Sequence, residues 1–246
     1  MAFQRAIVVG ASSGIGESLA RRLAAEGCHV ALVARRQPEL DRIAKDIRES
    51  GGKAEVFLHD VLAFEEAPPL FDRIVETLGG VDLLVYASGV LLETQEGEYD
   101  FAKDRRTIEV NLLGAMAWCN PAAARFEAQR KGTLIGISSI AGVRGRRGNP
   151  AYGTSKAALT TYLEALRNRL GRYGVRVVTV KPGYIDTAMT RGKPGLFWLI
   201  SADEAAAQTL ALARRGSRSG FVPARWALIA LVLRAIPSFI FRRLNF

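Results

Sequence analysis

Short runs of apolar, mostly β-branched residues recur along the chain and alternate with longer stretches that mix apolar and polar positions. The runs lie at 6–9, 30–33, 54–58, 83–86, 134–137 and 175–180. Most of their positions are apolar, instead of every second one. This pattern is typical of strands that are buried on both faces of a parallel sheet.

The mixed stretches are long enough to form helices that connect parallel strands. The clearest of them lie at 17–26, 38–50, 101–130 and 151–173. Repeated right-handed strand–helix–strand units produce a doubly wound sheet. The sequence therefore predicts an α/β fold with a single Rossmann-type parallel sheet of about seven strands and helices on both faces.

The C-terminal part of the chain departs from this alternation. A break rich in glycine and proline at 191–195 is followed by five apolar residues, a pattern typical of a mobile flap over an apolar pocket. We expect this flap at about 187–200, within a catalytic domain at 1–223. The remaining residues, 224–246, are apolar and basic and are expected to form a helical tail.

A helix is expected to begin directly after the flap. Ser201 can accept a hydrogen bond from the first helical turn, and Glu204 stands three residues later. This spacing is that of a capping box, in which the two side chains satisfy backbone N–H groups reciprocally.

The composition is that of a globular protein with a sizeable core. Hydrophobic residues make up 49% of the chain and charged residues 24%. Two cysteines and two histidines offer material neither for a disulfide framework nor for a metal site, so we expect no bound metal. The first residues lack the pattern of a secretory signal. A cytoplasmic location is therefore expected.

The chain is strongly basic, with a formal net charge of +10, and the basic residues are unevenly distributed. No acidic residue follows Glu204, whereas seven arginines do, interleaved with apolar runs. That pattern favours a membrane surface over a nucleic acid, because nucleic-acid readers mix cations with polar residues. We therefore expect no nucleic-acid partner.

The tail itself leaves two interpretations open. Arg234 and Pro237 interrupt it, and it is too short to span about 30 Å of hydrocarbon. It could lie in the plane of a membrane interface as a peripheral contact. Alternatively, it packs on its own domain or on a second subunit, where its apolar residues are equally useful.

A glycine-rich turn follows the first predicted strand and opens the first predicted helix. Gly10, Gly14 and Gly16 allow a tight turn and a close approach of the backbone to phosphates, which can bind the free N–H groups at the start of the helix. In this context the turn predicts a dinucleotide site. Its residues are Gly10, Ser12, Ser13, Gly14, Ile15 and Gly16.

The second strand ends at Arg35 and Arg36, where an enzyme that uses NAD normally has an acidic residue for the ribose hydroxyls. A guanidinium there can pair with a 2′-phosphate, so Arg35, helped by Ser12 and Arg36, predicts NADP(H). The alternative is a pair of solvated surface arginines. Asp60, after the third strand, could bind the adenine amino group or cap a helix.

Candidate catalytic residues follow the fifth strand. Tyr152 and Lys156 are four residues apart on one helix face, where a cation lowers the pKa of a phenol, about 10 when unperturbed. Ser139, at the end of the strand, can bind the substrate oxygen. Asn111 can order a water molecule that relays protons past Lys156.

With these motifs the sequence closely resembles the short-chain dehydrogenase/reductase family, over about residues 5–222. The family's glycine motif matches Gly10, Gly14 and Gly16, and its Asn-Ser-Tyr-Lys tetrad matches Asn111, Ser139, Tyr152 and Lys156. The resemblance also implies that Ile185 and Thr187 contact the nicotinamide carboxamide. The further cofactor-binding residues expected are Val61, Ala87, Ser88, Gly89, Pro182 and Gly183, together with Asn111, Tyr152 and Lys156.

The sequence departs from the family pattern in two places. Tyr86-Ala87-Ser88-Gly89 stands where the family has Asn-Asn-Ala-Gly, so a hydrogen bond that usually steadies the sheet must be replaced. Ser13 stands where many NADP-preferring relatives carry a cation, so the choice of cofactor depends on the arginines after the second strand.

The resemblance implies an NADPH-dependent enzyme that interconverts a ketone or aldehyde and an alcohol, with Tyr152 as proton donor and acceptor. The apolar flap and tail favour a lipophilic substrate, such as a 3-oxo lipid, a ketosphinganine-like base or a sterol-like compound. The alternative is a catalytically silent NADP(H)-binding regulatory or scaffold protein. Family members usually assemble through two long helices, here 101–130 and 151–173, so we expect a homodimer or homotetramer.

Overall fold

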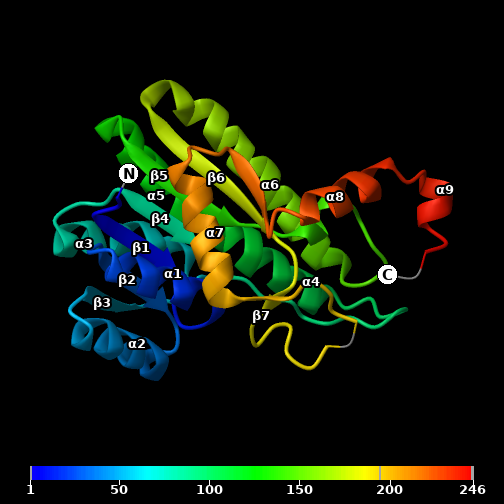
Figure 1. Ribbon diagram of the computed structural model, residues 1–246, viewed down its shortest axis with the longest axis horizontal. Helices are drawn as coiled ribbons and strands as arrows, with labels where there is room; N and C mark the ends of the chain where they lie inside the picture. Colours follow the sequence, from blue (N-terminus) through cyan, green and yellow to red (C-terminus); the bar gives the residue numbers. More distant parts are fainter. Residues whose placement is uncertain (1, 194, 245–246) are drawn as a thin grey trace.

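A computed structural model describes residues 2–193 and 195–244 (Figure 1). Within these residues one sheet of seven parallel strands forms, in the order β3-β2-β1-β4-β5-β6-β9. The predicted fold class and strand arrangement are thus confirmed. The strands are β1 (Arg5–Val9), β2 (His29–Ala34), β3 (Lys53–Leu58), β4 (Leu83–Tyr86), β5 (Gly132–Ile137), β6 (Val175–Pro182) and β9 (Ser219–Val222).

Helices cover both faces of the sheet and bury two apolar cores (Figure 1). One core packs the sheet against α1 (Gly14–Ala25), α2 (Gln37–Glu49) and α7 (Ala202–Arg214). The other packs it against α3 (Ala67–Leu78), α5 (Gly114–Gln129) and α6 (Pro150–Leu170). Because both faces of the strands are covered, their nearly continuous apolar character is explained.

The helix expected at 101–130 is divided by one π-helical turn. It consists of α4 (Phe101–Ile108), the π-turn Glu109–Leu113 and α5. At the end of the turn the Gly114 N–H donates to the carbonyl oxygen of Glu109, five residues earlier. Such turns insert a residue into a helix and are frequent at functional sites.

Tyr86 supplies a hydrogen bond beside this turn. Its side chain is fully buried, and its hydroxyl donates to the Val110 carbonyl oxygen at 2.6 Å. A Cβ atom at position 114 would lie 2.6 Å from that hydroxyl, so Gly114 makes the room. This hydrogen bond joins β4 to the helix that covers it. It lies at the segment where Tyr86 stands in place of the first asparagine of the family's Asn-Asn-Ala-Gly pattern, and where a lost hydrogen bond had to be replaced.

The expected flap lies between two short strands that pair with each other, β7 (Ile185–Asp186) and β8 (Ile200–Ser201). Pro194, in the predicted break, lies outside the described residues. After the flap, the Ser201 hydroxyl accepts a hydrogen bond from the Glu204 N–H at 3.0 Å, as predicted. The Glu204 carboxylate binds Gln208 in the next turn.

The predicted tail forms two helices, α8 (Trp226–Ala235) and the short α9 (Ser238–Phe241). They extend from the body of the molecule as an arm (Figure 1). Among the described residues, no helix combines the length and the apolar character that crossing a bilayer would require.

We predict that Tyr86→Phe lowers the free energy of unfolding by about 1–3 kcal/mol, because it leaves the buried Val110 carbonyl without this donor. Urea denaturation measures the effect. Tyr162→Phe is the matched control: its hydroxyl donates to the exposed Asn120 side chain at 2.8 Å, which water can serve instead. Equal losses in the two variants would contradict a special contribution of Tyr86.

Candidate active site

A cavity of about 510 Å³ lies at the carboxyl ends of the strands. Chain connections leave β1 and β4 in opposite directions across the sheet, which makes this edge the switch point where doubly wound folds bind ligands. Every site residue predicted from the sequence lines the cavity except Asp60 and Asn111. The fold therefore brings together residues that lie up to 177 positions apart in the chain, from Gly10 to Thr187.

The glycine turn is packed so tightly that side chains are excluded. Gly10 has φ +91°, and a Cβ atom there would lie 2.5 Å from the Ser88 nitrogen. A Cβ atom on Gly16 would lie 2.1 Å from the Gly10 carbonyl oxygen. Helix α1 begins at Gly14, and Ser13 makes no capping hydrogen bond to its first turn. This cradle with an uncapped helix start fits the diphosphate of a dinucleotide.

The two arginines after β2 have different surroundings. The Arg36 guanidinium donates to the hydroxyls of Ser12 and Ser13, both at 2.8 Å. Arg35 is more than half exposed and lies 3.6 Å from the Asp60 carboxylate. Both arginines line the cavity. Arg36, expected only to help Arg35 bind the 2′-phosphate, is thus the arginine beside Ser12.

Asp60 caps a turn after β3. Its Oδ1 atom accepts a hydrogen bond from the Leu62 N–H at 3.1 Å, and its other oxygen faces Arg35. Its side chain does not line the cavity. Of the two roles that the sequence left open, the structure shows a backbone cap, of a turn instead of a helix, and the adenine contact stays a prediction.

Ser139 and Tyr152 meet at the centre of the cavity wall. Ser139 follows β5 directly, and its hydroxyl accepts a hydrogen bond from the Ala141 N–H at 3.1 Å. Tyr152 lies in the first turn of α6, after Pro150, and is hydrogen-bonded to the Ser139 side chain. The hydroxyls of these two residues thus converge, although they come from separate elements.

Burial dominates the protonation of Tyr152. It raises the pKa of the phenol, while the hydrogen bond with Ser139 and the positive charge of Arg146 lower it. Lys156 points its ammonium at the Ile137 carbonyl oxygen, 3.0 Å away, and 5.8 Å from the centre of the Tyr152 ring. Arg146 is thus a cation that lowers the pKa of Tyr152, and the same effect of Lys156 stays a prediction.

The environment of Lys156 is itself unusual. The side chain is buried, and this burial lowers the pKa of its ammonium from 10.5 to about 8. Removal from water disfavours the charged form of a lysine. Lys156 thus gains or loses a proton within reach of neutral pH, as suits a group that takes part in proton transfer.

Asn111 lies in the π-turn. Its side chain does not line the cavity but joins neighbouring segments by hydrogen bonds. Its amide accepts a hydrogen bond from the Val90 N–H at 2.8 Å and donates to the Val90 carbonyl at 3.0 Å. It also donates to the Ser155 hydroxyl at 3.0 Å, which donates to the Tyr152 carbonyl. The side chain is fully buried, and its bonds connect the loop after β4 to α6; its role in ordering a proton-relaying water stays a prediction.

Several residues of the cavity wall were not identified from the sequence. Arg146 and Asn149 come from the loop before α6, and Lys193 comes from the flap. Lys193 forms an ion pair with Glu93 at 2.7 Å, which ties the flap to the loop after β4. These residues stand in irregular segments, where neither periodicity nor a motif signals a position in a site.

The parallel sheet, the glycine cradle and the cavity at the switch point define a dinucleotide-binding α/β protein. Comparison with known proteins specifies the family. Residues 4–194 match the family model described as short chain dehydrogenase. The chain therefore belongs to the short-chain dehydrogenase/reductase family and is an oxidoreductase that uses a nicotinamide cofactor, NAD or NADP.

Relatives and solved structures are consistent with this assignment. An oxidoreductase of Myxococcus xanthus is 34% identical over 190 residues, covering 77% of this chain and 75% of the relative. One of Mycobacterium tuberculosis is 30% identical over 244 residues, covering 98% of this chain and 96% of its own. A short-chain type dehydrogenase/reductase from Mycobacterium ulcerans shares the fold, with a TM-score of 0.82, 24% identity and coverage of 90% and 89%.

We predict that Arg146→Gln raises the pKa of Tyr152, because a positive charge that favours the phenolate is removed. Ultraviolet difference titration measures it, with Tyr152→Phe identifying the contribution of this phenol. Arg147→Gln is the control, since the neighbouring Arg147 does not line the cavity. An unchanged or lowered pKa in Arg146→Gln, or the same rise in both variants, would contradict the assignment.

Proposed function

We propose that the protein is an NADP(H)-dependent reductase of lipophilic ketones, which also catalyses the reverse oxidation of the alcohol. The observation that carries the proposal is the convergence of Ser139, Tyr152 and Lys156 on the cavity that also holds the glycine cradle. Each of these side chains is common by itself. Their meeting at one wall beside a diphosphate site is the arrangement that carbonyl reduction requires.

The proposed preference for NADP(H) is supported by the charges at the end of β2. Arg35 and Arg36 both line the cavity there, and the bonds from Arg36 to Ser12 and Ser13 form a cluster of donors. A guanidinium can bind a phosphate with two hydrogen bonds, whereas a carboxylate would select the ribose hydroxyls of NAD. No carboxylate lines the described part of the cavity.

The chemistry of the reaction is divided between the cofactor and the protein. A bound nicotinamide cofactor supplies or accepts the hydride. Ser139 donates a hydrogen bond to the carbonyl oxygen, and Tyr152 protonates that oxygen as it gains negative charge. Lys156 would hold the nicotinamide ribose and, with its pKa of about 8, can return a proton to Tyr152 after each turnover.

The walls of the cavity support a lipophilic substrate with the carbonyl near one end. Beside the reactive residues the walls are apolar, with Leu91, Ile140, Met189 and Leu196. The positive charge of Arg146 at the same wall disfavours a substrate with an ammonium group near its carbonyl. Among the lipophilic classes considered, a 3-oxo lipid or a sterol-like ketone therefore fits better than a ketosphinganine-like base.

We further propose that the protein assembles as a homodimer or homotetramer. The proposal rests on the family, whose members commonly pair through the two long helices that correspond here to α4–α5 and α6. Two large side chains at the start of this region, Tyr99 and Phe101, are 96% and 78% exposed. An oligomer could cover them.

We predict that Tyr152→Phe lowers turnover by about 10²- to 10⁴-fold, because the proton donor is lost, while the affinity for NADPH changes little. Oxidation of NADPH with a panel of ketones and aldehydes gives the first value, and fluorescence titration gives the second. Tyr162→Phe is the control, because Tyr162 lies on the same helix but does not line the cavity; this variant should keep wild-type turnover.

Two outcomes would overturn this prediction. Turnover above about a tenth of wild type in Tyr152→Phe would end the mechanistic claim. A wild-type protein that binds NADPH but turns over no member of the panel would favour the silent regulatory or scaffold protein instead.

We also predict that Arg36→Ala weakens NADPH binding about tenfold to a hundredfold, because charge-assisted hydrogen bonds to the 2′-phosphate are lost. NADH binding should change little, and Arg35→Ala should act in the same direction. Isothermal titration with both cofactors measures the effect. Arg42→Ala is the control, because Arg42 on α2 binds Glu17 and Asp46 outside the cavity. Equal weakening of NADPH and NADH would contradict selection by Arg36.

A further inference from the structure

Helix α8 has two apolar faces, of which only one is covered. Trp226 and Ala230 are 3% exposed and pack on the domain. Leu228, Leu231 and Val232 point the other way and are 65%, 67% and 56% exposed. A surface helix normally turns polar residues outward. An outer row of large aliphatic side chains is therefore a surface that something else covers.

Arginines flank this apolar row on both sides. At about 100° per residue, Leu228, Leu231 and Val232 lie within one arc of the helix, opposite Trp226. By the same spacing Arg225 falls beside one edge of that arc and Arg234 falls about 60° beyond the other edge, and both are exposed. This is the cross-section of a helix that lies in a membrane interface, with apolar side chains downward and cations reaching the headgroups.

The second tail helix also exposes large apolar side chains. Phe239 and Ile240 of α9 are 58% and 42% exposed, and Arg242 and Arg243 follow them, both exposed. We call these residues, with the outer row of α8 and its two flanking arginines, the tail surface. It contains five large apolar side chains and four cations.

The tail surface is held firmly on the domain. Arg144, from the loop before α6, donates to the carbonyl oxygens of Leu233 and Ile236 and stacks on the Phe241 ring, 3.9 Å from its centre. Arg147 donates to the Arg242 carbonyl at 2.7 Å. The loop that carries Arg146 into the cavity thus also fixes the orientation of the tail.

The charge of the tail surface argues for an anionic lipid bilayer and against a second copy of the chain. No acidic residue occurs after Glu204, so a two-fold contact through this surface would bring arginines against arginines. Anionic headgroups supply the opposite charge to all four cations. The acidic side chain nearby, Glu96, already pairs with Arg147.

The length of the tail fixes its orientation. Helix α8 has 10 residues, which corresponds to about 15 Å and is half of the hydrocarbon thickness. It cannot cross a bilayer, and it is followed by a turn at Pro237. The tail surface can therefore only lie along the membrane plane.

An aromatic cluster connects the tail surface to the flap and to the cavity. Trp226 stacks on Phe197 of the flap at 5.1 Å and meets Trp198 and Tyr184 edge to face at 5.8 and 5.2 Å. Arg225 lies over the Trp198 ring at 5.3 Å. Tyr184 lines the cavity. The flap, where Phe197 and Trp198 are 47% and 39% exposed, thus packs against Trp226 on the face of α8 opposite its outer row.

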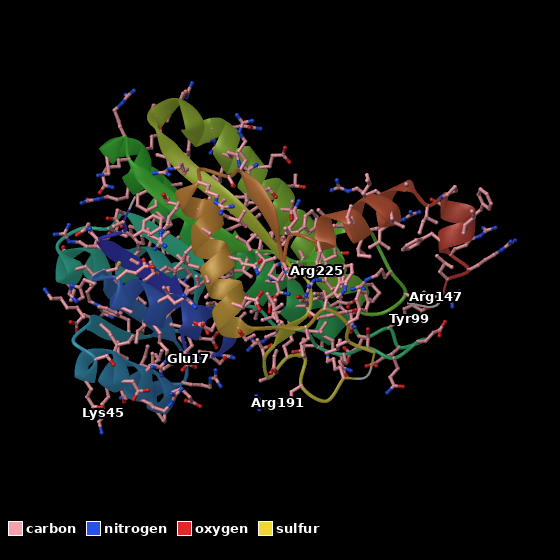
Figure 2. The ribbon with its side chains drawn as sticks, in the orientation of Figure 1. Glu17, Lys45, Tyr99, Arg147, Arg191 and Arg225 are labelled. Carbon is pink, nitrogen blue, oxygen red and sulfur yellow. The ribbon has the colours of Figure 1, made fainter. Side chains whose placement is uncertain are left out.

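We propose that the tail surface docks the protein on anionic lipid bilayers in an in-plane orientation, with the outer row of α8 toward the lipid. The Arg147 end of the molecule then contacts the membrane, and the end with Lys45 points to solvent (Figure 2). The docking does not depend on turnover, so Tyr152→Phe should bind bilayers like the wild type. Failure of the proposed reaction and failure of docking are thus separate results.

Flotation of the full chain with vesicles tests the proposal. Vesicles of phosphatidylcholine alone are compared with vesicles that contain about a third of phosphatidylglycerol, at low and high salt. We expect flotation with the anionic vesicles only, weakened by salt. In Leu228→Glu/Leu231→Glu the partition coefficient should fall about tenfold or more. Arg234→Gln/Arg243→Gln should lose most of the preference for anionic lipid.

Lys45→Gln/Lys53→Gln is the matched control, because it changes the net charge by the same two units at a distance from the tail. It should float like the wild type. Near-ultraviolet circular dichroism and NADPH binding verify that each variant is folded. Absence of flotation by the wild type, or equal flotation of Leu228→Glu/Leu231→Glu, overturns the proposal. If that variant instead dissociates an oligomer and wild type ignores vesicles, the tail surface is a subunit contact.

Discussion

The candidate active site depends on the amide side chain of Asn111. From a π-turn it bonds both backbone groups of Val90, in the loop after β4, and the hydroxyl of Ser155, on the helix that carries Tyr152 and Lys156. Because Asn111 is fully buried, none of these bonds can be replaced by bulk water without exposing the core. The hydrogen bond from the Tyr86 hydroxyl to the Val110 carbonyl attaches the same turn to β4. The positions of the reactive groups therefore follow from a polar brace inside an apolar core.

Burial by that core also sets the chemistry. It raises the pKa of Tyr152 and lowers the pKa of Lys156 to about 8, which moves the two pKa values further apart than those of free side chains. Ser139 and Arg146 oppose the effect on Tyr152. A phenol with a raised pKa keeps its proton until charge develops on a substrate oxygen, as suits the donor in a reduction. The reverse oxidation then depends on the opposing contributions of Ser139 and Arg146.

The same loop contacts both the tail and the cavity. The loop of Arg144, Arg146 and Arg147 reaches Tyr152 on one side and caps α8 on the other. On the far side of α8, Trp226 packs on Gly183, where a Cβ atom would lie 2.0 Å from the indole, and on the aromatic side chains of the flap. Trp226 thus connects the covered face of α8 to the flap that borders the cavity.

The sequence by itself determined the layered α/β fold, the glycine turn, the cap at Ser201 and the order of the candidate catalytic residues, because these features depend on local periodicity and on spacing within one element. It did not reveal α3, which begins with two prolines, or the π-turn, which shifts the helix by a single residue. Only the tertiary structure decided that Asp60 caps a turn, that Arg36 lies beside Ser12 and that Arg146 acts on Tyr152. Each of these contacts joins segments far apart in the chain or within an irregular loop, and the free energy that selects among them comes from packing and burial, which no local pattern encodes.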